Sequence, residues 1–479
     1  MKRTLASLLA LSLAGCAMGP DYKRPETAPP ENHRGAAGPA TGASLADLAW
    51  WDLAKDDQVL VGLLKEALAK NQDLKIAAAR VEEARAISRI NYVLPQVSAG
   101  AGAARGRVSE NVGSLAGGQT LNAFELTAAF TWEIDLWGRL RRTNESTLAR
   151  FLATEEARRG VSLGLVSDVA AAYYQLRSLD MQLEIAQRTV KSRQDSFDLV
   201  EKRLRGGIGN KLESSQAASA LAQTEIAVPQ IEQAIFEQEN LISLLLGRNP
   251  GPIARGKAIG EMPAVEIPAG LPSALLERRP DVLEAEANLR AANAEVGIAE
   301  ANLFPQLSLT GSAGFQSTDL SDLLKSPSFV WNIAGGIFAP IFQGGRLRRE
   351  RDAAHARWDQ ARLAYEKAAL AAFGDTASSL NAIGKTREIR EANGRNVDAL
   401  RDAEKTALLR YDGGVSPYLE VLDAQRELFS GELNYATSLR DQKLAVIRLY
   451  RALGGGWNTP EMPPEGQAPA TPAPASTSK

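Results

Sequence analysis

Residues 124–142 read FELTAAFTWEIDLWGRLRR, and this stretch decides the fold of the chain. From Phe124 to Leu136 every second residue is apolar, and the residues between them are polar or small. A period of two places the two sets on opposite faces of a β-strand, one suited to lipid and the other to water. At Gly138 the period becomes helical and stays so to about Leu204. The stretch therefore predicts a membrane-type strand, 124–137, that passes directly into a long helix.

The same transition occurs a second time in the chain. The motif GRLRR stands at 138–142 and again at 345–349, and in both places it follows an alternating stretch. Other short matches keep nearly the same offset, such as Gly206-Gly207 with Gly413-Gly414. A constant offset over this length indicates an internal duplication of one strand–strand–helix–helix unit.

Composition and periodicity divide the chain into segments. They predict a signal peptide at 1–15, a lipidated tether at 16–44, a linker at 251–270 and a disordered tail at 456–479. The first repeat is predicted at 45–250, with a strand pair at 95–137 and a long helix pair at 138–246. The second repeat is predicted at 271–455, with a strand pair at 305–342 and a helix pair at 345–453. The tether and the tail are rich in Pro, Gly and Ala, which disfavours a packed core.

The N-terminus carries a targeting signal. Lys2 and Arg3 precede a short apolar stretch that ends in Leu-Ala-Gly-Cys16, and this resembles the bacterial lipoprotein signal, in which the Cys is acylated. The alternative is a secretory signal followed by a chance Cys. Because Cys16 is the only cysteine, an acylated chain has no thiol left for a disulfide, a metal or catalysis.

Other classes of protein are disfavoured by composition. The 55 basic and 57 acidic residues nearly cancel, so no nucleic-acid partner is indicated. There are two histidines and no metal-ligand spacing, phosphate loop or nucleophile motif, so we expect no enzyme, no metal and no cofactor. No apolar run reaches the roughly 18–20 residues of a spanning helix. If the chain crosses a membrane, it does so with strands.

Four membrane-type strands are too few to close a barrel, and an open sheet edge is not tolerated in lipid. The chain must therefore associate with copies of itself. Two copies give eight strands and three give twelve, and the sequence pattern alone does not choose between them.

The whole pattern resembles the TolC/OprM-type outer-membrane factors, specifically their NodT-like lipoprotein subgroup. The match covers nearly the whole mature chain. Its most specific motifs are Leu-Ala-Gly-Cys16 followed by residues 19–25 (GPDYKRP), residues 278–282 (RRPDV), residues 302–305 (NLFP), residues 418–425 (YLEVLDAQ) and residues 452–457 (ALGGGW). The resemblance implies a mixed α/β membrane protein, a homotrimer whose twelve strands form one outer-membrane β-barrel continuous with a long antiparallel α-helical barrel in the periplasm.

The resemblance also implies the function. It implies a lipid-anchored exit duct in the outer membrane for drugs or other small molecules, coupled through a periplasmic adaptor to a proton-driven inner-membrane transporter that selects the substrates. Two alternatives stay open: a duct for an ATP-driven protein secretion system, and a lipid-anchored periplasmic coiled-coil adaptor without a pore. The alternation at 124–137 disfavours the second, because an adaptor needs no lipid-facing strand.

The resemblance assigns two sets of functional residues. Leu419 and Asp423, one helical turn apart, match the periplasmic gate, where three copies give an apolar ring and an acidic ring. The glycines of the two predicted helix turns, Gly206, Gly207, Gly209, Gly413 and Gly414, match the tips that meet the adaptor. Both sets also have a purely structural interpretation, as coiled-coil and turn residues.

Two groups of arginines follow the membrane-type strands: Arg139, Arg141 and Arg142, and then Arg346, Arg348 and Arg349. Their position beside the predicted membrane surface suits binding to lipid phosphates. A solvated helix start without a specific partner fits the sequence equally well.

Overall fold

The computed structural model describes residues 17–35, 45–47, 49, 54–107, 109–111, 118–261 and 274–456. The predicted signal peptide, Cys16 and all but the first residue of the predicted tail lie outside these ranges. The chain forms two compact units. Unit 1 comprises residues 1–28, 76–158 and 281–369, and unit 2 comprises residues 29–75, 159–280 and 370–479.

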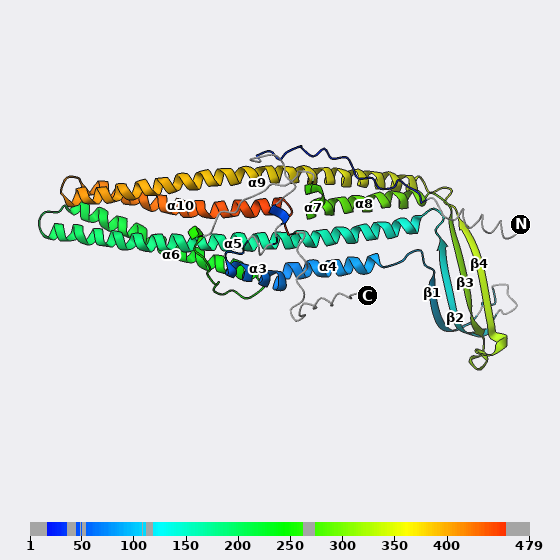
Figure 1. Ribbon diagram of the computed structural model, residues 1–479. Coiled ribbons are helices and arrows are strands. Elements are labelled where there is room, and N and C mark those ends of the chain that lie inside the picture. Colours follow the sequence, from blue (N-terminus) through cyan, green and yellow to red (C-terminus); the bar gives the residue numbers. More distant parts are fainter. Residues whose placement is uncertain are drawn as a thin grey trace, which may run out of the picture. The chain divides into compact units, whose positions relative to one another are not determined.

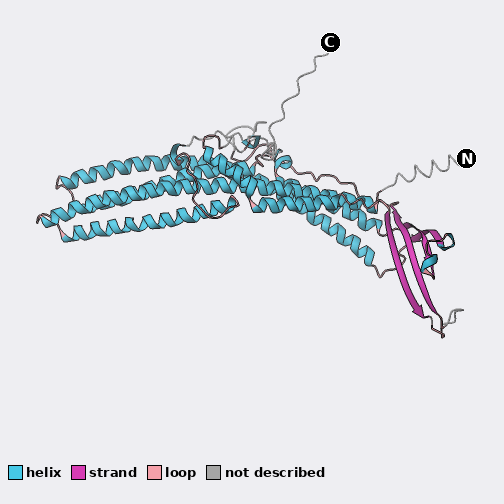
Figure 2. Ribbon diagram, turned by 90° about the horizontal axis from the view of Figure 1, so that it is seen from below, coloured by secondary structure: helices cyan, strands magenta, loops and turns pink. Residues whose placement is uncertain are grey.

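Unit 1 contains one antiparallel sheet of four strands in the order β1-β2-β3-β4 (Figures 1 and 2). The strands are β1 (Gln96–Arg107), β2 (Thr120–Ile134), β3 (Gln306–Ser317) and β4 (Phe329–Phe338). The outer strands β1 and β4 each have one neighbour in the sheet. The sheet therefore has two edges whose backbone groups are free to pair with another strand.

The main helices are α3 (Gln58–Lys70), α4 (Gln72–Ser88), α5 (Arg139–Arg205), α6 (Lys211–Leu245), α7 (Leu275–Arg278), α8 (Pro280–Ala301), α9 (Arg346–Asp412) and α10 (Tyr418–Ala452) (Figure 1). Short 3-10 turns stand at η1 (Leu45–Asp47), η2 (Ile259–Glu261), η4 (Leu320–Asp322) and η5 (Ser326–Ser328). The chain breaks between α3 and α4 because the Asn71 side chain accepts from the Leu74 N–H at 2.9 Å and so starts a new helix. Among the described residues, no helix combines the length and apolar content needed to cross a membrane.

The strand predicted at 124–137 is shifted in the structure. It begins four residues earlier, at Thr120, and pairing ends at Ile134. The reason for the earlier end is Asp135, whose carboxylate accepts from the Leu140 N–H at 3.0 Å and the Arg141 N–H at 2.9 Å. Asp135 thus caps the first turn of α5 instead of continuing the polar face of the strand.

The last strand is shorter than expected. The alternating pattern predicted a strand over 329–342, whereas β4 ends at Phe338, two residues before Pro340. Proline has no N–H to donate to a sheet and restricts the residue before it, so the ladder ends there. Ile341 and Phe342 are left strongly exposed.

In unit 2 the four long helices share one core. Its buried members are Val200 of α5, Ala217 of α6, Ala407 and Tyr411 of α9, and Tyr418 and Val421 of α10. The Tyr411 and Tyr418 rings lie 5.2 Å apart, and the Arg203 guanidinium stands 4.5 Å above the Tyr411 ring. Both helix pairs are therefore held to each other by apolar and cation–π contacts close to their turns.

The first described residues are docked in unit 1. We call residues 17–24 the N-terminal strap. The Met18 N–H donates to Trp137 O at 2.9 Å, and Asn293 of α8 donates to Pro20 O at 2.7 Å. Buried Glu286 of α8 accepts from Tyr22 at 3.1 Å and from Arg24 at 3.0 Å. The segment predicted as a tether thus begins as an extended but firmly bound strap.

Candidate functional site

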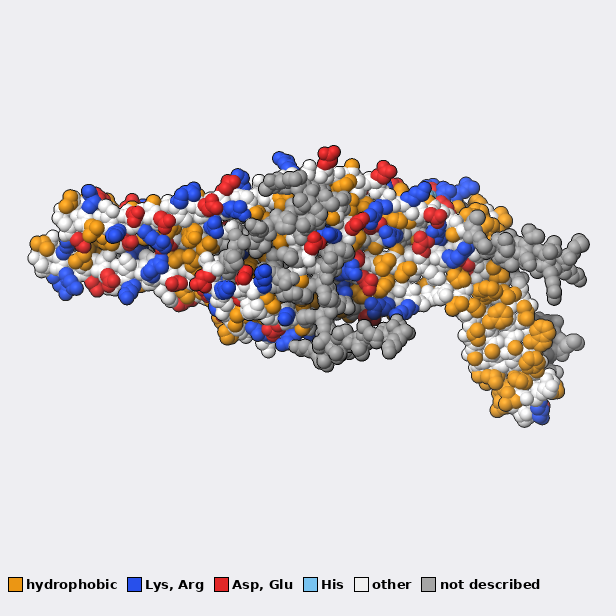
Figure 3. Space-filling view, viewed as in Figure 1, with side chains coloured by type: hydrophobic (Ala, Val, Ile, Leu, Met, Phe, Trp, Pro, Cys, Tyr) orange, Lys and Arg blue, Asp and Glu red, His pale blue; other side chains and the backbone are white. Residues whose placement is uncertain are grey.

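The register of the sheet aligns its apolar residues on one face. Directly opposed residues of antiparallel strands point to the same side, so each row can be followed across the sheet. The rows are Ala101, Leu126, Phe315 and Phe329; Ala99, Ala128, Ala313 and Trp331; Val97, Phe130, Gly311 and Ile333; Trp132, Leu309 and Gly335; and Ile134, Leu307 and Ile337. Hydrophobic side chains cover the part of the sheet seen in Figure 3. Ten residues of a strand extend over about 33 Å. When the strand is inclined by about 40° to the membrane normal, they span a height of about 25 Å, which is the height of the apolar band of an outer-membrane protein.

The other face of the sheet is largely polar and made mostly of small side chains, with Val330 and Phe338 of β4 as apolar exceptions. Its rows are Gly102, Glu125 and Gln316; Gly100, Thr127, Gly314 and Val330; Ser98, Ala129, Ser312 and Asn332; Gln96, Thr131, Thr310 and Ala334; and Glu133, Ser308 and Gly336. Hydroxyl and amide groups predominate. The sheet can therefore stand between lipid and water, as the alternation at 124–137 predicted.

Two tryptophans mark the end of the sheet where β2 meets α5. Trp132 Nε1 donates to Val93 O at 2.9 Å, and Trp137 Nε1 donates to Pro305 O at 2.7 Å. The Trp137 ring also packs on Phe304, with centroids 4.8 Å apart. Amphipathic rings with a satisfied N–H are typical of the boundary between lipid and water.

The first arginine group is already engaged within the chain. Arg139 binds Glu133 through two nitrogens, at 2.9 and 2.5 Å, and Arg141 reaches Asp135 at 3.2 Å. Arg142 is buried, and it donates to Asp21 at 2.9 Å and to Glu145 at 2.7 Å. These arginines join the sheet, the strap and the start of α5, so they are not a solvated helix start.

The second arginine group is arranged differently. Arg346 donates to Glu350 at 2.6 Å. The side chains of Arg348 and Arg349 are exposed and make no hydrogen bond or ion pair with any other residue that the structure describes. The hydrogen bond from Arg351 lowers the pKa of Asp352, and the charge of Arg349 adds to that effect. The guanidinium donors of Arg348 and Arg349 are open to a phosphate.

The two predicted helix turns have the same backbone geometry. After α5 the Gly207 N–H donates to Leu204 O and the Ile208 N–H to Arg203 O, both at 3.1 Å. After α9 the Gly414 N–H donates to Tyr411 O at 3.0 Å and the Val415 N–H to Arg410 O at 2.9 Å. This is the Schellman arrangement, and it needs a positive φ, which is 78° at Gly207 and 69° at Gly414.

Gly206 and Gly413 are the first residues after α5 and α9, and neither has a positive φ. Gly209 is required for a different reason. A Cβ there would lie 2.5 Å from the backbone nitrogen of Leu204, so no other residue fits without moving the turn. Gly207, Gly209 and Gly414 thus have a structural role in the turns, and contact of the five tip glycines with an adaptor stays a prediction.

The tips also carry exposed apolar side chains, and of these the sequence analysis named Leu419 as a gate residue but did not single out Ile208 or Val415. Ile208 and Val415 occupy the same place in the two turns and are 82% and 71% exposed. Leu212 and Leu419 follow one turn later and are 61% and 60% exposed. The repeat offset that relates the two glycine turns relates these pairs too, and it is the signal that could have found them.

The two predicted gate residues lie on the outer side of α10. Leu419 is exposed, whereas its neighbours Tyr418 and Val421 are buried in the four-helix core. The side chain of Asp423 is 60% exposed and bonds to Arg426. The structure therefore brings Leu419 and Asp423 onto one face that points away from the core of their own chain.

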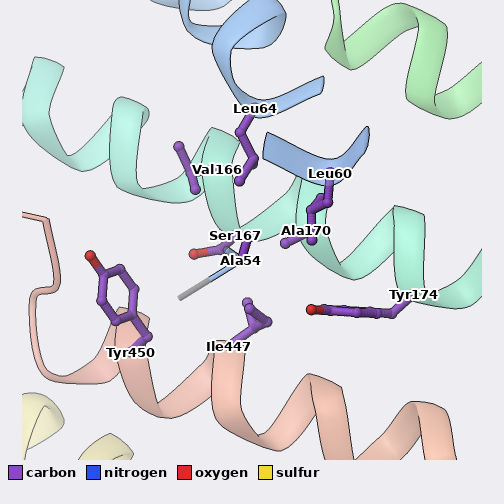
Figure 4. A pocket seen from close by; sticks show the side chains of 9 residues that line it. All are labelled: Ala54, Leu60, Leu64, Val166, Ser167, Ala170, Tyr174, Ile447 and Tyr450. Carbon is purple, nitrogen blue, oxygen red and sulfur yellow. The ribbon is translucent and has the colours of Figure 1, made fainter. Parts of the chain in front are cut away.

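Unit 2 also contains a pocket (Figure 4). It lies between α3, α5 and α10, and its lining is Ala54, Leu60, Leu64, Val166, Ser167, Ala170, Tyr174, Ile447 and Tyr450. The Ser167 hydroxyl donates to Leu163 O of its own helix at 2.8 Å. The pocket has an apolar lining without a nucleophile–base pair, so packing accounts for it.

These features define a class of protein. One sheet with a lipid-type face and a polar face, joined to long antiparallel helices with exposed tips, is the chain architecture of a membrane channel that needs further copies to close. The fold class expected from the sequence, a four-stranded sheet combined with long paired helices, is confirmed.

Comparison with known proteins identifies the family. The family model described as "Outer membrane efflux protein" matches residues 63–248 and 271–455. The solvent efflux pump outer membrane protein SrpC of Pseudomonas putida is 36% identical over 467 residues, which cover 95% of this chain and 98% of that protein. The cation efflux system protein CusC of Escherichia coli is 35% identical, with 95% and 99% covered.

Solved structures agree with this result. The outer-membrane channel OprN superposes with a TM-score of 0.86 at 32% identity, covering 92% of this chain and all of that chain. A crystal structure of CusC gives a TM-score of 0.82 at 32% identity over the same shares. The chain therefore belongs to the outer membrane efflux protein family and is an outer-membrane component of an efflux system. The family is one of transport proteins; the absence of enzymatic activity and the lipoprotein subgroup stay predictions.

Proposed function

We propose that three copies of this chain form the exit channel of a tripartite efflux pump. The observation that carries the proposal is the register of the sheet, which separates a continuous apolar face from a continuous polar face. Such a sheet is stable in lipid only when its edges are paired. Pairing β1 of one copy with β4 of the next gives twelve strands in a trimer and leaves no free edge.

The exposed tips support docking to a periplasmic adaptor. Ile208 of the first repeat and Val415 of the second give each pair of helices the same apolar end. A repeated apolar end suits an elongated adaptor that binds both repeats in the same way. The proposal includes a proton-driven transporter in the inner membrane, to which the adaptor would connect the channel. It is supported by the names of two relatives, because SrpC is described as part of an efflux pump and CusC as part of an efflux system.

The N-terminal strap supports a lipid anchor at a defined place. Ala17, the residue after Cys16, lies against Gly138. A Cβ added to Gly138 would come within 2.7 Å of the Ala17 Cα. An acyl chain on Cys16 would then start beside the Trp137 end of the sheet and enter the adjacent leaflet. Arg348 and Arg349 would bind lipid phosphates, while the paired arginines of the first group would hold the strap and the sheet together.

The deciding experiment measures pore formation. The purified protein should run as a trimer in detergent and produce single-channel currents in a planar bilayer. A chain that binds adaptor in the periplasm but never conducts would support a scaffold and contradict the channel.

Crosslinking from cysteines placed at Ile208 and Val415 in cells should capture an adaptor and a small-molecule transporter. Capture of an ATP-driven protein exporter would replace efflux by protein secretion.

A further inference from the structure

The polar face of the sheet carries very few ionisable groups. Across the paired positions of the four strands there are two, Glu125 and Glu133, both on β2. The arginines of β1 do not belong to this face, because Arg105 and Arg107 alternate with it and share the side of Val97 and Ala101. The charge on the polar face is therefore set by two carboxylates.

One of these carboxylates is neutralised. Glu133 is held by the two guanidinium bonds from Arg139, and both side chains are 28% exposed. A bidentate pair of this kind cancels the charge seen from the solvent. Glu133 therefore contributes little to the field on the polar face.

The other carboxylate has no partner. Glu125 is exposed and makes no hydrogen bond or ion pair with any residue of the described part of the chain. Its side chain lies across Gly102 of β1, where an added Cβ would be 2.9 Å from Oε1 and 3.0 Å from Cγ. The glycine gives the carboxylate room to lie flat on the polar face, beside the uncharged Gln316 of β3.

Glu125 also lies at the level of the membrane. On β2 it stands between Phe124 and Leu126, and the Leu126 row belongs to the apolar band of the opposite face. In a closed assembly the polar face lines the lumen, so each copy contributes one unpaired negative charge to the same level of the channel.

From this arrangement we infer that Glu125 gives the channel its preference for cations within the membrane span. The inference rests on the proposed channel function and adds the charge class of the solutes that pass most easily. Three carboxylates around a water-filled lumen raise the local concentration of cations and lower that of anions. Cationic cargo is favoured over anionic cargo of the same size.

The test is the reversal potential in a planar bilayer with a tenfold gradient of KCl. Glu125→Gln should reduce the ratio of potassium to chloride permeability by roughly two-fold in about 0.1 M salt, because the charges lie on the order of one Debye length from the axis. The difference from the wild type should grow in about 0.01 M salt, where screening is weaker. Gln316→Glu, which adds a second acid to the same row, should change the ratio in the opposite direction.

The control is Glu83→Gln, which removes one exposed carboxylate from α4 and should leave the ratio unchanged. Conducting Glu125→Gln channels with the ion preference of the wild type would overturn the inference and leave the proposed function intact. A wild-type chain that never conducts would overturn both. Trimer content on a native gel verifies that each variant assembles.

Discussion

Phe130 and Thr131 are adjacent residues on opposite faces of β2. Phe130 lies between Val97 and Gly311, and a Cβ at Gly311 would come within 2.3 Å of the Phe130 ring, so the glycine makes room for it. Phe130→Arg would place a charge in the middle of the lipid band at a cost of about 2–4 kcal/mol. We expect that variant to lose most of its assembled trimers, measured by heat-modifiable migration of outer-membrane fractions.

Thr131 is the matched control at this scale. It lies between Gln96 and Thr310 on the polar face, so Thr131→Arg should assemble normally and lower single-channel current by narrowing the lumen. If both variants assembled equally well, the assignment of the two faces would be wrong.

We expect the contact between the N-terminal strap and α8 to weaken in acid. Burial alone would raise the pKa of Glu286, but hydrogen bonds from Arg24 and Arg290 prevail and hold it below the ordinary value. A carboxylate with a lowered pKa stabilises the fold above its unfolded pKa, and that contribution is lost as pH falls through the folded pKa. Strap docking should therefore be constant from neutral pH to about pH 5 and weaken below about pH 4.

Hydrogen exchange of residues 17–24 across this pH range measures the effect. Glu286→Gln should make the free energy of strap docking at neutral pH less favourable by about 2 kcal/mol. This value is smaller than that of a fully buried pair because the side chains of Arg24 and Arg290 are 40% and 45% exposed. It should also remove most of the pH dependence. Glu350→Gln, which breaks the exposed pair with Arg346, is the control and should change strap exchange very little.

The predicted gate requires the whole assembly. Leu419 and Asp423 project away from the core of their own chain, so only neighbouring copies bring them together near an axis. Replacing Leu419 by Ser and Asp423 by Ala should raise single-channel conductance and reduce block by divalent cations, because the apolar ring and the acidic ring are both removed. Folding should be unchanged, since neither side chain belongs to the four-helix core.

The equivalent residues of the first repeat provide the control. Leu212 is as exposed as Leu419, but Gln216 stands in place of the acid. Leu212→Ser with Gln216→Ala should leave conductance and divalent block close to wild type. If the second-repeat variant conducts like the wild type while the trimer stays intact, the constriction lies elsewhere. Because Arg426 bonds to Asp423, the acidic ring should respond to divalent ions less than three bare carboxylates would.

The local structure of this protein follows from its sequence. The alternation over residues 124–136 predicts a strand because alternation is a property of neighbours in the chain. Gly207 and Gly414 specify turns because few other residues tolerate a positive φ. The duplication then carries both features from one repeat to the other. Motif resemblance added the expected family, gate and tips.

Which groups meet depends on the three-dimensional fold. The pairing of Phe130 with Gly311, the binding of Arg24 to Glu286 and the bond from Arg142 to Asp21 each join residues more than a hundred positions apart. The ends of strands were also decided by contacts, since Asp135 caps α5 rather than extending β2. Likewise Glu125 and Glu133 look alike in the alternating pattern, and only the position of Arg139 shows that one is neutralised while the other keeps its charge. Periodicity reports the face on which a side chain lies, and it does not report the partner that the fold brings to it.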